Sequence, residues 1–101
     1  MKTTIQEISG KTRVTVQGEL DTNSSETFQK NIASLMEKEG VVVELDLGAL
    51  EYISSKALRI IVSFQQAVVA NHGSFCITEV SDSVREVLDM TGLSKSFLEL
   101  S

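Results

Sequence analysis

Residues 45–59, which read LDLGALEYISSKALR, are the most informative part of the chain. It begins as an apolar strand, passes through a short polar turn and continues as a helix that starts on the adjacent Ser54 and Ser55. The first turn of a helix has backbone N–H groups without internal partners, and the positive end of the helix dipole lies there. A phosphoryl group on a serine at this place would be well held and would add about −1.5 to −2 charges. The pattern therefore favours a surface switch over an enzyme.

Length and composition limit what the chain does. Of its 101 residues, 42% are hydrophobic, which is enough for the core of one domain spanning residues 1–101. The net charge of −5 would repel the phosphates of a nucleic acid. No apolar run approaches the ~20 residues of a membrane span, and residues 1–4 lack an apolar signal region. We expect a cytoplasmic protein with neither nucleic-acid binding nor membrane insertion.

Apolar periodicity and glycine positions predict the element order β-β-α-β-α-β-α, followed by an edge strand or packed tail at residues 97–100. Strands are expected at residues 3–8, 12–17, 41–47 and 75–78, and a loop at residues 18–21. Nearly continuous apolarity over residues 41–47 indicates a central strand covered on both faces. Alternation of helices and strands predicts a layered α/β fold around a mixed sheet of four to five strands.

The three expected helices have recognisable boundaries. The first has an N-cap among residues 23–25, with Glu26 placed as a capping-box acid, and ends at Gly40. The second covers residues 55–71 and is closed by Gly73. Its apolar positions exceed one narrow stripe, which indicates deep burial or, in part, a partner surface. The third starts at a cap on residue 81 or 82 and ends at residues 92–93, which match a Schellman motif.

The residues that enzyme and metal sites require are scarce. His72 is the single histidine and lies in a polar turn, so we expect a solvated side chain rather than a metal ligand or a catalytic base. Cys76 is the single cysteine and lies between Phe75 and Ile77, as is typical of a buried structural thiol. No glycine-rich phosphate loop is present. We therefore expect no enzymatic activity, no metal and no cofactor.

The ordered set of segments resembles the STAS domain family, the fold of bacterial anti-sigma factor antagonists. Residues 18–21 resemble the loop before the family's first helix, and residues 43–59 resemble its central strand, turn and second helix. Gly73 with the strand after it and residues 84–97 resemble the C-terminal third, so the resemblance covers essentially the whole chain. It implies a STAS-like layered fold.

In that family the turn usually reads aspartate, a phosphorylatable serine, serine or threonine, and glycine. The resemblance places the phosphorylated serine on Ser55, whereas Ser54 replaces the aspartate, Lys56 the next hydroxyl residue and Ala57 the glycine. It implies partner switching, in which the protein binds an anti-sigma factor with serine kinase activity and so regulates transcription indirectly. Phosphorylation weakens that complex and a phosphatase resets it. The implied partner-binding residues are Asp21, Ser54, Ser55 and Lys56.

The same residues also allow purely structural roles and a second function. Ser54 and Ser55 could be an ordinary helix cap and an inert first-turn residue, and Asp21 could be a plain cap. Standalone STAS proteins also resemble docking subunits of lipid-transporting ABC systems. The paired serines favour the antagonist, whereas Lys56 and the missing aspartate favour the docking subunit. A nucleotide-binding STAS domain has no support from a phosphate loop.

Overall fold

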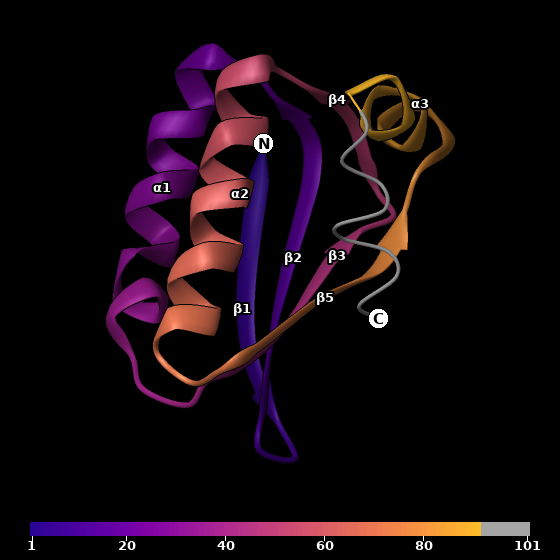
Figure 1. The fold of residues 1–101 in the computed structure, drawn as a ribbon. Coiled ribbons are helices and arrows are strands. Elements are labelled where there is room, and N and C mark those ends of the chain that lie inside the picture. The colour runs from indigo at the N-terminus through magenta and orange to yellow at the C-terminus, as the bar shows by residue number, and fades with distance from the viewer. Residues whose placement is uncertain (92–101) are drawn as a thin grey trace.

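The computed structural model of the chain describes residues 1–91. Within them, five strands form one sheet: β1 (Lys2–Ile8), β2 (Lys11–Leu20), β3 (Val42–Leu47), β4 (Leu50–Ile53) and β5 (Ser74–Val80). The helices of this part are α1 (Thr22–Glu37), α2 (Ser55–Ala70) and α3 (Asp82–Thr91). Helices α1 and α2 lie side by side on one face of the sheet, and α3 lies beside β4 (Figure 1). The features predicted at residues 92–93 and 97–100 lie outside the described residues.

The sheet is mixed, as predicted. Strands β1 and β2 form an antiparallel hairpin, whereas the pairs β2–β3, β3–β5 and β2–β4 are parallel. Strand β3 lies between β2 and β5, which confirms its predicted central position. The prediction that it is covered on both faces is wrong. Val43, Leu45 and Leu47 are fully buried, but Glu44 and Asp46 point to the other face and are only half-buried.

The largest difference from the predicted elements is strand β4. The sequence pattern predicts a short turn between the strand at residues 41–47 and the helix at Ser55, and a loop at residues 18–21, but β4 pairs with the end of β2, which continues to Leu20. Gly18 lies at a register shift in this pairing and has φ +88°, a conformation that glycine adopts without steric cost. A four-residue strand held by a distant partner has too little periodicity to be recognised along the chain.

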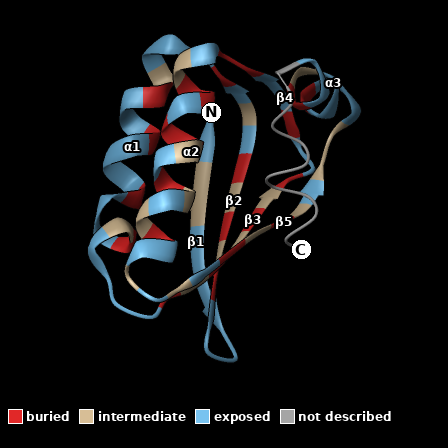
Figure 2. Ribbon diagram, viewed as in Figure 1, coloured by how far each residue is buried: buried red, intermediate tan, exposed pale blue. Residues whose placement is uncertain are grey.

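The core lies between the sheet and the α1–α2 layer, where buried residues mark the sheet-facing sides of both helices (Figure 2). Phe64 of α2 and Phe75 of β5 pack edge to face, with ring centroids 5.3 Å apart. Most apolar positions of α2 are buried in this core, which leaves Val69 as its large exposed hydrophobic residue. Burial therefore accounts for most of the apolar excess predicted in this helix.

Candidate functional site

Two helix starts lie next to each other at one edge of the sheet. Strands β2 and β4 run parallel and end together, with Leu20 opposite Ile53, and each strand leads directly into a helix. The Ser54 amide donates to the Leu20 carbonyl at 2.9 Å, which joins the start of α2 to the start of α1. Figure 1 shows both helices beginning at its upper edge. The carboxyl end of parallel strands is where α/β proteins generally place their sites.

Asp21 is the N-cap of α1. Its Oδ1 accepts from the Ser24 amide at 2.8 Å, and the Ser24 hydroxyl accepts from the Asp21 amide at 2.9 Å, which completes a capping box. The predicted cap at residues 23–25, with Glu26 as its acid, is therefore wrong. The Ser24 amide, followed by its hydroxyl, holds the pKa of Asp21 below its ordinary value. The plain-cap interpretation of Asp21 describes these contacts correctly.

The adjacent serines at the start of α2 have different surroundings. Ser54 is the N-cap, is only 6% exposed, and accepts from the Ala57 amide at 3.1 Å. Ser55 is the first residue of the helix and is exposed, and its hydroxyl has no hydrogen-bond partner within residues 1–91. One hydroxyl therefore stabilises the helix start, while the other is accessible for modification.

Lys56 forms an ion pair across the two helices. Its Nζ lies 3.0 Å from Oε1 of Glu26 on α1, and this hydrogen bond lowers the pKa of Glu26. The sequence pattern predicts a capping role for Glu26 and gives no sign of this contact. The two residues are 30 positions apart, and only the packing of α1 against α2 brings them together.

Strand β4 adds an aromatic residue close to this site. Tyr52 lies two residues before Ser54, pairs with Glu19 of β2 and is 50% exposed. Tyrosine is enriched among the residues that dominate protein interfaces. Its exposure follows from the existence of β4, which the sequence pattern does not predict, so no local signal marks Tyr52 as a surface residue.

The other candidate residues lie away from the helix starts. His72 follows the end of α2 and is exposed, as expected, and its Nδ1 lies 2.6 Å from Oε1 of Glu39. Cys76 on β5 is half-buried, although a buried thiol was expected. Burial, and secondarily Glu44, raises its pKa, which disfavours the reactive thiolate. Among residues 1–91 no cluster of His, Cys, Asp and Glu is suited to a metal ion.

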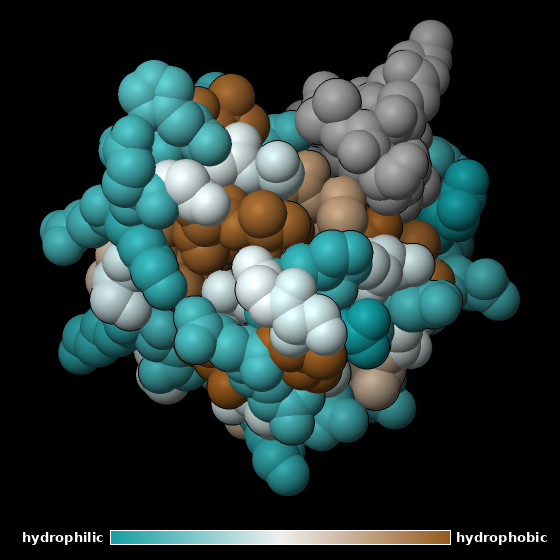
Figure 3. Space-filling model, turned by 90° about the horizontal axis from the view of Figure 1, so that it is seen from below, coloured by the Kyte–Doolittle hydropathy of each residue, from teal (hydrophilic) through white to brown (hydrophobic). Residues whose placement is uncertain are grey.

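A hollow of about 490 Å³ lies along the last turns of α2, far from Ser55 in the helix. The described residues that line it are Gln65, Gln66, Val69 and Ala70, whose side chains are amides and small hydrocarbons. Figure 3 views the molecule from below, opposite the helix starts, and shows apolar patches scattered among polar side chains. In the part of the chain from Met1 to Thr91, no helix is long and apolar enough to cross a bilayer.

Comparison with known families identifies the fold. The model of the STAS domain matches residues 2–101. The chain belongs to the STAS domain family. This STAS protein is 31% identical over 97 residues to the anti-sigma factor antagonist BtrV of Bordetella bronchiseptica, an alignment that covers 96% of this chain and 84% of BtrV.

Solved structures have the same architecture as this STAS protein. An anti-sigma factor antagonist from Mycobacterium paratuberculosis superposes with a TM-score of 0.84 at 24% identity, covering 95% of this chain and 81% of the other. SpoIIAA in its unphosphorylated form superposes with a TM-score of 0.81 at 17% identity, covering 96% of this chain and 86% of SpoIIAA. The phosphorylated form of SpoIIAA from Bacillus superposes with a TM-score of 0.75 at 16% identity, covering 96% of this chain and 89% of SpoIIAA. These likenesses confirm the predicted STAS-like α/β fold.

Proposed function

We propose that this STAS protein is an anti-sigma factor antagonist that binds an anti-sigma factor with serine kinase activity and is released by phosphorylation of Ser55. The observation that carries the proposal is the exposed Ser55 hydroxyl at the start of α2, beside a serine that already caps the helix. The similarity to BtrV supports the class of function. SpoIIAA, known with and without its phosphate, supports phosphorylation within this fold.

The proposed partner surface contains Asp21, Ser54, Ser55 and Lys56, which the β2–β4 pairing and the α1–α2 packing gather at one end of the molecule. Asp21 and Ser54 hold the two helix starts in place through their caps. Ser55 and Lys56 present a hydroxyl and a cation to the partner. A phosphatase would restore the binding form, and the whole cycle would take place in the cytoplasm.

A phosphate on Ser55 should leave the fold intact. It would lie at the N-terminus of α2, where the helix dipole favours negative charge by about 0.3–1 kcal/mol. The switch must therefore act at the partner's surface, where the phosphate adds bulk and a double charge that resists desolvation. A loss of about 3 kcal/mol of binding free energy would weaken the complex about 100-fold.

The test compares pull-downs from the native cytoplasm with wild-type, Ser55→Asp and Ser63→Asp baits. Ser63 is also exposed on α2 but lies two turns farther along, so its variant adds the same charge away from the site. We expect wild type and Ser63→Asp to recover the same serine-kinase-type ATPase, and Ser55→Asp to lose it about 100-fold while melting near the wild-type temperature. Recovery of a permease and a transport ATPase by all three baits would instead support the docking subunit.

A further inference from the structure

Lys56 breaks a local rule of helix stability. It lies in the first turn of α2, where the positive end of the helix dipole disfavours a cation, and this turn contains no acidic residue. Positions where a sequence departs from local preference are often functional. A lysine at this position, beside Ser55, is therefore a candidate for a functional role.

Glu26 offsets the misplaced charge from another helix. The Lys56 ammonium is hydrogen-bonded to the Glu26 carboxylate at 3.0 Å, and the two side chains are 38% and 68% exposed. Exposed ion pairs contribute little to folding stability, so the pair has no strong structural purpose. It does restrain the flexible stem of Lys56 and holds two opposite charges in a fixed arrangement next to Ser55.

We infer that the Lys56–Glu26 ion pair is a specificity determinant, read by a partner that places an acidic group against Lys56 and a basic group against Glu26. The inference rests on the proposed function, because it assigns the partner to the surface around Ser55. Complementary charges at an interface increase the association rate, and like charges brought together reject wrong partners. Holding both charges before binding reduces the ordering cost of the complex.

The experiment is a charge swap that keeps the ion pair. The double variant Glu26→Lys/Lys56→Glu retains opposite charges at the same two positions, and it places an acid at the start of α2, where the dipole favours one. It should melt at or slightly above the wild-type temperature. Its affinity for the serine-kinase-type anti-sigma factor recovered by wild type, measured with the purified proteins, should fall at least tenfold, mainly through slower association.

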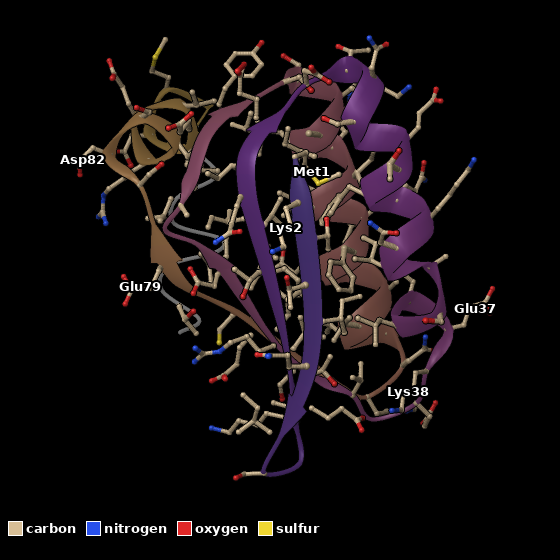
Figure 4. The ribbon with its side chains drawn as sticks, turned by 180° about the vertical axis from the view of Figure 1, so that it is seen from behind. Met1, Lys2, Glu37, Lys38, Glu79 and Asp82 are labelled. Carbon is tan, nitrogen blue, oxygen red and sulfur yellow. The ribbon has the colours of Figure 1, made fainter. Side chains whose placement is uncertain are left out.

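A matched control pair joins strand β1 to the end of α1. Lys38 and Glu7 form a similarly exposed pair at 3.3 Å, and Figure 4 shows Lys38 at the lower end of the molecule, away from the helix starts. The swap Glu7→Lys/Lys38→Glu should leave the affinity unchanged within about twofold, because the pair lies away from the proposed partner surface, where salt screens it, and the net charge is unchanged. Should the first swap destabilise the fold, the neutral variant Glu26→Gln/Lys56→Gln replaces it and should weaken binding severalfold.

The results of these measurements distinguish a failure of the ion-pair inference from a failure of the proposed antagonist function. If wild type binds the anti-sigma factor and both swaps bind equally well, the specificity role is wrong while the proposed function stands. If wild type recovers no such partner, the proposed function fails and the inference falls with it. Weaker binding of the Glu26–Lys56 swap, with unchanged binding of the Glu7–Lys38 swap, would support the inference.

Discussion

Where α1 and α2 begin, Ser55, Lys56 and Glu26 expose a hydroxyl and two charges, whereas backbone contacts dominate where the same helices finish. At that lower end the Gly40 amide donates to the Asn71 carbonyl at 2.8 Å, and the Asn71 side chain donates to the Met36 carbonyl at the same distance. These bonds tie the connection after α1 to the connection after α2. The lower end is therefore built for stability.

The difference between the ends shows where substitution is tolerated. Changes at Ser55 or Lys56 touch exposed side-chain atoms, so they alter a surface without disturbing a packed contact. Changes at the lower end disturb the backbone on which the helix layer depends. Function that must vary between partners is better placed at the exposed end, as is usual for segments positioned by a rigid scaffold.

The largest expected effect is at Gly73, and it would test the structural role of the lower end. A Cβ there would lie 2.3 Å from the Val41 carbonyl and 2.9 Å from Val68, so Gly73→Ala should cost about 3 kcal/mol of unfolding free energy. The melting temperature should then fall by roughly 12–24 °C.

Gly40→Ala is the control for Gly73→Ala. Gly40, unlike Gly73, has a positive φ, +67°, but no atom lies within 4 Å of the added Cβ, so the cost should be about 1 kcal/mol. Thermal melts of both variants measure the difference. Equal losses would show that the close contact at Gly73 is not what constrains this end.

A medium effect should separate the two serines at the helix start. Ser54→Ala removes the N-cap of α2 and should cost about 1 kcal/mol, whereas Ser55→Ala should change the unfolding free energy by less than about 0.5 kcal/mol. Urea unfolding measures both. An equal loss in Ser55→Ala would mean that Ser55 has a structural role that the described contacts do not include.

The smallest effect should appear in the pH dependence of stability. The folded pKa of Asp21 lies below its ordinary value of 3.8, so its contribution is present above that pH and is lost as the pH falls through the lowered folded pKa. Asp21→Asn keeps a side chain that caps well but does not titrate. Melting from pH 6 to pH 2.5 should therefore decline slightly less in Asp21→Asn than in wild type. An identical decline in the melting temperatures of the two proteins would show that the Asp21 carboxylate does not contribute to the loss of stability in acid.

Several features were predictable because they depend on neighbours along the chain. The hairpin of β1 and β2, the central position of β3, and the start of α2 at Ser55 follow from alternation, apolar runs and capping residues. The same reasoning placed Ser55 at a helix start. It failed for the cap of α1, because Asp21 and residues 23–25 are all acceptable caps and the choice depends on where β2 ends.

Composition and local periodicity are enough to specify the α/β class, the helix that begins on two serines and the scarcity of catalytic residue types. The pairing of β4 with β2, which places Asp21 beside Ser54, is visible in the folded molecule alone. The same is true of the contact between Lys56 and Glu26, which are 30 residues apart. Such contacts arise from the packing of elements that are distant in the sequence. The local sequence pattern does not predict which residues that packing brings together.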